Sequence, residues 1–387
     1  MSDKGNREGG DYVIRRAEVP DRDELVSVLN SAFSRDETRS LDFLSFLPHA
    51  FTPERIGDHL VRVEGGRILG CVGLYPYEVR VGGVSFRAAG VGQVGTLREA
   101  RGQGVMTSLL RQACLDADAA RYDFCWLGGD RVRYGRHGWA TGGVRMRFWF
   151  PRRFLPEPPD EAGVRRLEPG RDFERVRDHL ARDPNTVVVD DLELRRILEG
   201  KATGGWVSGD AFIVYRRGIG NVYLADGTPE EIGRLLSHHL RWLESEPKWD
   251  GDLAVHCAPA DSALMRACRL YYAGLSMSPS GMFRVGPLRA FLEKVCRAAQ
   301  PKVAEGSGAV SLVNAETGEA VTVRCIGGRL SVEDGAQEGA YNLGRRDLSE
   351  ACFGLCPLDV YLPGLPEDSF LRRVLPLPAH WSRFFGV

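Results

Sequence analysis

The sequence lacks paired cysteines, although it contains nine cysteines. The number is odd, no Cys-x-x-Cys pair occurs, and the residues are scattered between Cys71 and Cys356. This pattern argues against the disulfide framework of a small secreted domain and against the usual spacing of a zinc site. We therefore expect reduced thiols, most of them in the core, and no bound metal.

Long apolar runs and an excess of charge of one sign are also missing. No stretch of eighteen apolar residues occurs, and the start, MSDKGNREGGD, has no apolar segment of an export signal, so we expect a cytoplasmic protein without membrane contact. Lys and Arg number 51 against 52 Asp and Glu, so no global field favours nucleic acid as a partner. Hydrophobic residues make up 43% of the chain, which is enough for two or three full cores.

The most informative stretch is VGTLREARGQGVM, residues 94–106. An apolar run that ends at Thr96 predicts a strand, and apolar residues at helical spacing from Met106 onward predict a helix. A helix start presents N–H groups without intrahelical partners, and the helix dipole adds positive potential. In the turn between them, Gly102 and Gly104 let the backbone come close to a ligand, and Arg101 adds a permanent positive charge. The turn therefore predicts a phosphate-binding site.

The turn lacks both common nucleotide fingerprints. No Gly-Lys-Ser/Thr follows it, which disfavours a P-loop, and the Gly-x-Gly-x-x-Gly spacing of a dinucleotide-binding turn is absent. It resembles instead the Arg-x-x-Gly-x-Gly/Ala signature of the GCN5-related N-acetyltransferase (GNAT) superfamily, carried by Arg101, Gly104 and Met106, although Met106 departs from the Gly/Ala of that pattern. The resemblance implies that the turn binds the pyrophosphate of acetyl-coenzyme A.

A second motif follows about thirty residues later. The segment FCWLGGDRVRYGRHGW predicts a strand, a glycine turn and a short helical turn. Its ending resembles the Tyr-x-x-x-Gly-Phe/Tyr of the same superfamily, with Tyr134, Gly138 and Trp139 at the matching places. The resemblance implies that Tyr134 is the general acid that protonates the departing thiolate of coenzyme A.

Composition divides the chain into three predicted domains, 1–150, 151–285 and 286–387. The proline-rich stretch 151–163 predicts a linker, and a weaker break lies at 278–291. The first two segments begin alike: each has an apolar-Arg-Arg start, a proline turn, an Arg-Asp pair and an amphipathic helix. This predicts a duplicated fold. The second copy enters its later helix through DGTPEEIGRLL, whose acidic start repels phosphate, so only the first copy is expected to bind the cofactor.

The predicted fold class is α/β (α+β): tandem GNAT-type mixed-sheet domains followed by a small sterol-carrier-like α+β domain. This order resembles the enhanced intracellular survival (Eis) family of bacterial acetyltransferases. The family resemblance implies a homo-oligomer, such as a hexamer. It also implies that the backbone of Val94 and Thr96 pairs with the pantetheine arm. The residues that it places around the pyrophosphate are Arg101, Gly102, Gln103, Gly104, Val105 and Met106.

Two further candidate groups are a base at the end of the chain and an acidic turn after the first predicted helix. In the Eis family the terminal carboxylate helps to deprotonate the amine, which makes the carboxylate of Val387 the candidate base. The family usually ends on an aromatic residue, whereas this chain ends Phe-Phe-Gly-Val. Asp36 and Glu37 form an acidic turn suited to attract a cationic amine.

These expectations describe an acetyl-coenzyme A dependent N-acetyltransferase whose acceptor is a primary amine of a small or cationic molecule that attacks directly. Two alternatives stay open: a non-catalytic protein that holds an apolar or coenzyme A-linked ligand, and an acyltransferase that uses a different acyl-coenzyme A. For His238 and His239, on a predicted amphipathic helix, we expect one buried and one solvated ring and no metal.

Overall fold

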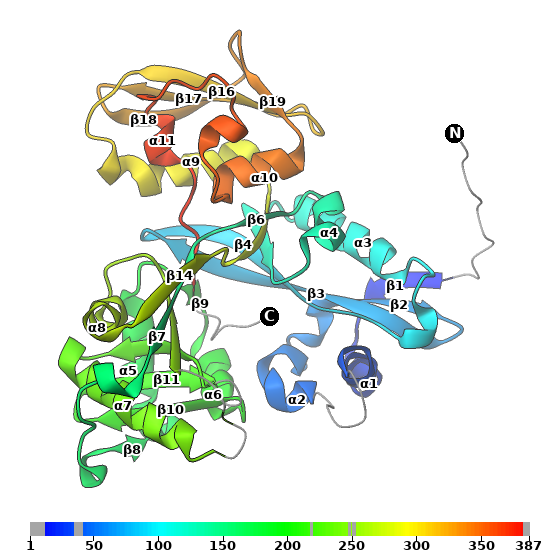
Figure 1. The fold of residues 1–387 in the computed structure, drawn as a ribbon. Coiled ribbons are helices and arrows are strands. Elements are labelled where there is room, and N and C mark those ends of the chain that lie inside the picture. Colours follow the sequence, from blue (N-terminus) through cyan, green and yellow to red (C-terminus); the bar gives the residue numbers. More distant parts are fainter. Residues whose placement is uncertain (1–11, 35–41, 217–219, 247–248, 250–252, 382–387) are drawn as a thin grey trace. The chain divides into compact units, whose positions relative to one another are not determined.

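The computed structural model describes residues 12–34, 42–216, 220–246, 249 and 253–381. Its strands form three sheets (Figure 1). The chain divides into two compact units. The first unit comprises the described residues up to 76 together with 89–121, and the second comprises 77–88 and the described residues from 122 onward. Two long strands, β3 (Arg67–Val81) and β4 (Val84–Thr96), contribute to both units.

The first unit joins antiparallel strands to helices that carry apolar residues at helical spacing. In α3 the buried side chains are Val105, Leu109, Leu110, Ala113 and Ala117, which form one stripe of the helix. Besides its parts of β3 and β4, this unit contains β1 (Tyr12–Arg16), α1 (Arg22–Phe33), α2 (Phe43–Phe46), β2 (His59–Glu64) and α3 (Val105–Ala119).

The eight-stranded first sheet has the order β1-β2-β3-β4-β5-β15-β6, and β9 pairs with the 77–81 end of β3. Its remaining strands belong to the second unit, and a short helix, α4, lies between β5 and β6 in the chain. These elements are β5 (Phe124–Leu127), α4 (Arg131–Tyr134), β6 (Ala140–Gly142), β9 (Val187–Val188) and β15 (Gly281–Val285).

The seven-stranded second sheet has the order β14-β7-β13-β12-β11-β10-β8. Among its described strands only β12 and β13 pair in parallel, and α7 and α8 pack against the sheet around a core of aliphatic and aromatic side chains. Its elements, with the helices between them, are β7 (Arg145–Phe150), β8 (Arg165–Arg166), α5 (Pro169–Arg182), α6 (Asp191–Glu199), β10 (Thr203–Ser208), β11 (Ala211–Arg216), β12 (Val222–Asp226), α7 (Pro229–Glu244), β13 (Leu253–Cys257), α8 (Ala263–Tyr271) and β14 (Gly274–Ser278).

The two large sheets exchange a strand. The chain leaves the first sheet after β6, and the next strand, β7, pairs with β13 and β14 in the second sheet. Later the chain leaves the second sheet after β14, and β15 pairs with β5 and β6 in the first. The predicted boundaries after residues 150 and 285 stay predictions, but each of these boundaries follows an exchanged strand.

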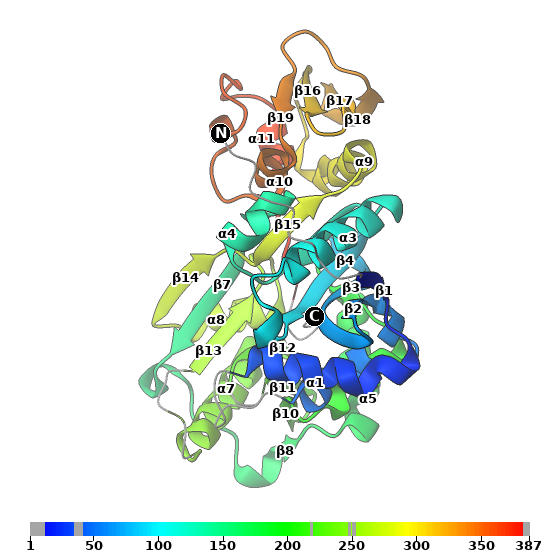
Figure 2. The ribbon, with the colours of Figure 1, turned by 90° about the vertical axis from the view of Figure 1, so that its right-hand side faces the viewer.

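The last part of the chain forms the four-stranded sheet β18-β17-β16-β19, with α9 packed beside it (Figure 2). Helix α10 packs instead on β15 and β6, and the ammonium of Lys294 on α9 lies 2.5 Å from the buried carboxylate of Asp123. The elements are α9 (Leu288–Ala299), β16 (Gly308–Asn314), β17 (Ala320–Ile326), β18 (Arg329–Asp334), β19 (Tyr341–Leu343), α10 (Arg345–Phe353) and α11 (Leu371–Val374).

These three sheets confirm the predicted fold class: two mixed sheets are followed by a small α+β layer. Seven of the nine cysteines are buried, as expected of core thiols. Among the described residues, no helix is both long and apolar enough to cross a membrane.

Candidate functional site

The Arg-Gly-Gln-Gly turn lies between β4 and α3, as the sequence predicts. The four residues Arg101 to Gly104 are exposed, and α3 begins at Val105. Gly102 and Gly104 have φ angles of +81° and +73°, a region in which residues with a Cβ are strained, and the space around both is open. In the part of the chain that the structure describes, no side chain caps the N-terminus of α3. The turn therefore offers an exposed, positively polarised helix start to an anion.

Side chains of the turn fasten it to neighbouring backbone. The guanidinium of Arg101 donates to the carbonyl of Ala32, near the end of α1, at 3.2 Å. Gln103 donates from Nε2 to the carbonyl of Glu99 at 3.0 Å. Because a guanidinium carries five N–H donors, the bond to Ala32 does not exhaust Arg101 as an anion ligand.

The strand before the turn packs closely on its neighbours. A Cβ at Gly70 of β3 would lie 2.7 Å from the carbonyl oxygen of Gly95 and 2.8 Å from Cγ1 of Val105. Only glycine at position 70 therefore lets β3, the end of β4 and the start of α3 meet. Val94 and Thr96, predicted to pair with the pantetheine arm, are half-buried on either side of the buried Gly95.

The corresponding helix of the second sheet, α7, begins with a capping box. Its N-cap is Thr228, whose hydroxyl accepts from the backbone N–H of Glu231, and Glu231 in turn accepts from the N–H of Thr228 at 2.9 Å. This capping box occupies the helix start and places a carboxylate there. That the second copy does not bind the cofactor stays a prediction from its acidic entry.

Tyr134 ends α4, and only 5% of it is exposed. The carboxylate of Asp130 caps this helix by accepting from the N–H groups of Val132 and Arg133. A Cβ at Gly129 would lie 2.2 Å from Cε2 of Tyr134, so the ring rests against a position that only glycine leaves open. Burial raises the pKa of Tyr134 above its ordinary value of 10, which keeps the phenol protonated near neutral pH.

Three predicted site residues, Asp36, Glu37 and Val387, lie outside the described residues. The prediction for the histidine pair is confirmed in its buried member. His239 is buried, accepts from the indole N–H of Trp206 at 3.1 Å and lies 2.8 Å from the carbonyl of Gly220. His238 is half-buried against the Trp206 ring. No group of residues suited to hold a metal occurs in the described ranges.

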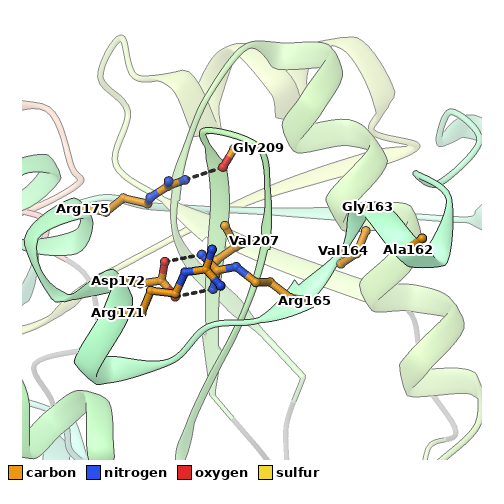
Figure 3. A pocket seen from close by; sticks show the side chains of 9 residues that line it. All are labelled: Ala162, Gly163, Val164, Arg165, Arg171, Asp172, Arg175, Val207 and Gly209. Atoms are coloured by element: carbon orange, nitrogen blue, oxygen red, sulfur yellow. Dashed lines mark hydrogen bonds and ion pairs between the residues drawn. The ribbon is translucent and has the colours of Figure 1, made fainter.

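Two cavities of about 320 Å³ lie in the second unit, and neither contains a predicted site residue. Figure 3 shows the first: Arg165 and Asp172 point toward one another as a two-bonded ion pair, and Arg175 donates to the carbonyl of Gly209. Protein groups therefore bind these two guanidinium groups already. The second cavity contains His179, whose Nδ1 lies 3.3 Å from Asp226.

Sequence reasoning missed an unusual residue in β4. Gln93 is buried and has a φ of +45°, and a side-chain hydrogen bond connects it to Tyr75 of β3. The available signal was a single amide in the otherwise apolar and glycine-rich run from Gly90 to Thr96.

Comparison with known proteins identifies the first domain. Residues 13–142 match the family model described as an acetyltransferase (GNAT) domain, which covers the strand, the turn and Tyr134. No curated protein matches the sequence.

Solved structures resemble nearly the whole chain. A GCN5-related N-acetyltransferase from Kribbella flavida is 19% identical, with 88% of each chain covered and a TM-score of 0.62. Eis1 from Mycobacterium abscessus is 16% identical over 92% of this chain and 90% of that chain, with a TM-score of 0.59. A probable N-acyltransferase from Enterococcus faecalis V583 is 15% identical over 96% and 97%, with a TM-score of 0.67.

At such identities the likeness concerns the fold: two mixed sheets and a small four-stranded sheet in one chain, as in the Eis-like arrangement. The domain match covers the candidate turn and Tyr134. Residues 13–142 therefore match an acetyltransferase (GNAT) domain, and the chain as a whole shares the fold of these solved structures.

Proposed function

We propose that this chain transfers the acetyl group of acetyl-coenzyme A to a primary amine of a small or cationic molecule by direct attack. The observation that carries the proposal is the exposed turn from Arg101 to Gly104, which opens an uncapped α3 with two left-handed glycines. Such a helix start suits a pyrophosphate, because N–H groups, the helix dipole and a guanidinium each attract an anion.

The remaining roles follow from the resemblance of the sequence motifs to those of the superfamily. The backbone of Val94 and Thr96 pairs with the pantetheine arm, and Gly102, Gln103 and the N–H groups of Val105 and Met106 hold the pyrophosphate. Tyr134, held in its protonated form by burial, gives its proton to the departing thiolate. The carboxylate of Val387 as base, and Asp36 and Glu37 as amine contacts, stay predictions from the sequence.

A pyrophosphate site recognises the coenzyme A part of the donor and does not contact the acyl chain, so other acyl-coenzyme A thioesters are alternative donors. The homo-oligomer, the cytoplasmic location and the absence of nucleic-acid and membrane partners stay predictions from the sequence.

Calorimetric titration with acetyl-coenzyme A tests the proposal. We expect micromolar binding by the wild type and a loss of at least about tenfold in affinity for Arg101→Glu, because the change removes a charge-assisted bond and adds a repulsive charge. Arg111→Glu makes the same change on an exposed residue further along α3 and is the matched control, with affinity close to that of the wild type.

Equal binding by Arg101→Glu and the wild type would contradict the assignment of the turn. A wild type that fails to bind acetyl-coenzyme A would reject the enzyme proposal itself. If binding occurs, release of coenzyme A is then measured with spermidine, 1,4-diaminobutane, lysine methyl ester and 2-phenylethylamine, which differ in charge and size.

A further inference from the structure

Gln93 breaks the regular geometry of β4 inside the first unit. A regular strand needs a φ near −120° at each residue, whereas Gln93 has +45°. The positive angle turns the two peptide groups that meet at Gln93 relative to one another, so they do not both follow the ladder. Apart from glycine, Arg121 is the only other described residue with a positive φ, and it is an exposed residue that follows a helix. Gln93 is instead buried in a strand, so local contacts must hold its backbone.

A chain of buried polar side chains supplies those contacts. The hydroxyl of Tyr75 donates to Oε1 of Gln93 and lies 2.7 Å from Nε2 of His59. His59 is buried, and its Nδ1 lies 3.1 Å from the carbonyl of Ile56, which can only accept. Nδ1 therefore carries the ring proton, Nε2 accepts, and the single hydroxyl proton of Tyr75 lies between two acceptors. We call His59, Tyr75 and Gln93 the Gln93 clamp.

Two further contacts fix the clamp. The thiol of Cys71 donates to the backbone carbonyl of Gln93 at 3.2 Å, so the main chain is held as well as the side chain. The ring of Phe51 stacks on His59 with centroids 5.1 Å apart. Burial lowers the pKa of His59 to about 4, which keeps the imidazole neutral and Nε2 an acceptor at physiological pH.

The position of the clamp relates it to the reaction, and this step rests on the proposed function. The pyrophosphate is assigned to the turn after Thr96, and the pantetheine arm runs back along Thr96 and Val94. The thioester then reaches the strand at Gln93, where the positive φ turns the two peptide groups relative to one another. A peptide N–H released from a ladder is a ready donor for the oxyanion that forms when an amine attacks a thioester.

We propose that His59, Tyr75 and Gln93 are positioning residues that hold the peptide at Gln93 turned toward the thioester carbonyl of bound acetyl-coenzyme A. The clamp acts through the backbone, and its side chains do not touch the reacting atoms. A left-handed backbone at position 93 is thus the feature that the reaction needs, and the side chains are the means of keeping it.

The test compares alanine with glycine at position 93. Gln93→Ala removes the clamp and leaves a residue that avoids a positive φ, whereas Gln93→Gly removes the clamp but accepts that φ without strain. Tyr75→Phe removes only the hydroxyl. We expect turnover with the best amine of the panel to fall about 100-fold in Gln93→Ala, the size seen when one oxyanion donor is lost. Gln93→Gly should recover most of that loss, and Tyr75→Phe should have no further effect when added to it.

A spectroscopic readout separates positioning from mere stability. The infrared band of the ¹³C-labelled thioester carbonyl of bound acetyl-coenzyme A should lie below its value in solution for the wild type and Gln93→Gly. It should return toward the solution value in Gln93→Ala and Tyr75→Phe, while calorimetry shows little change in acetyl-coenzyme A affinity. Thermal melting of each variant checks its fold. If Gln93→Ala does not fold, the turnover and carbonyl band of Tyr75→Phe are compared with those of the double variant Tyr75→Phe/Gln93→Gly. The clamp predicts that the added glycine restores both.

The outcomes are distinguishable. Alanine and glycine variants with the same turnover and the same carbonyl band, whether both high or both low, would overturn the clamp while leaving the acetyltransferase proposal intact. A wild type that neither binds nor turns over acetyl-coenzyme A would overturn the proposed function, and the clamp's role with it.

Discussion

At the scale of single residues, the candidate site depends on groups whose neighbours set their chemistry. Tyr134 is an example: a glycine at position 129 makes room for its ring, and burial keeps its phenol protonated. The sequence motif predicted this residue, but only the packing shows why its proton is retained. A general acid must hold its proton until the leaving group needs it, and a raised pKa serves that role.

We expect Tyr134→Phe to lower kcat by about 100-fold, since general acid catalysis contributes roughly that much, with the affinity for acetyl-coenzyme A unchanged. Because the pKa of Tyr134 is raised above 10, the midpoint of any fall in kcat that its deprotonation causes should lie above pH 10 in the wild type. Steady-state kinetics from pH 6 to 10 check both points. Tyr272→Phe, at a half-exposed tyrosine beside Phe148, is the control, and unchanged turnover in Tyr134→Phe would exclude the residue.

At the scale of elements, the repeated sequence pattern is a repeated structural unit. In the first copy, Arg15 of β1 forms two hydrogen bonds to Asp21 just before α1, and Asp21 also accepts from the N–H of Glu18. In the second copy, Arg165 of β8 forms two hydrogen bonds to Asp172 of α5, which accepts from the N–H of Glu168. Both ion pairs tie a strand to the helix that follows it.

The two pairs differ in exposure, which gives a matched comparison. The side chain of Asp172 is 2% exposed and that of Asp21 is 15% exposed. Asp172→Ala should destabilise α5 by about 2 kcal/mol, because it removes charge-assisted bonds and leaves Arg165 without its partner. Asp21→Ala should cost α1 less, because water replaces the lost contacts. Hydrogen exchange of the amides in α5 and α1 measures both effects, and equal protection in all three proteins would contradict the prediction.

The pH dependence of the Asp172 pair has a definite sign. Burial raises the pKa of Asp172, but hydrogen bonds from Arg165 and from the N–H of Glu168 lower it more, so the net shift is downward from 3.8. The pair's contribution is therefore complete above pH 3.8 and is lost as the pH falls through the lowered value.

At the scale of the whole molecule, the exchanged strands join the two large sheets. Strand β15 is paired on both sides, by β5 and β6, and β7 is paired on both sides, by β13 and β14. Phe148 and Phe150 of β7 are almost completely buried. A cut after residue 150 would therefore remove β15 from the first sheet. It would also separate Phe148 and Phe150 from β13 and β14, the strands that pair with β7.

We expect a fragment of residues 1–150 to lack a cooperative thermal transition and to bind acetyl-coenzyme A poorly when it is produced alone. Production together with residues 151–387 should restore both properties, because each fragment supplies the other with its exchanged strand. Near-ultraviolet circular dichroism and calorimetry measure the outcome. A well-folded, binding-competent fragment on its own would show that β15 is dispensable.

The sequence by itself determined the local features of this protein. The Arg-Gly-Gln-Gly turn, the start of α3 and the repeated strand–helix unit depend on residues close together in the chain, where turn chemistry and apolar spacing act directly. Tertiary structure alone decided the strand exchange and the Gln93 clamp. An exchanged strand has the same alternation as any other strand, so its partner is invisible in the sequence. The backbone of Gln93 depends on Tyr75 and His59, which reach it only through the packing of β2, β3 and β4.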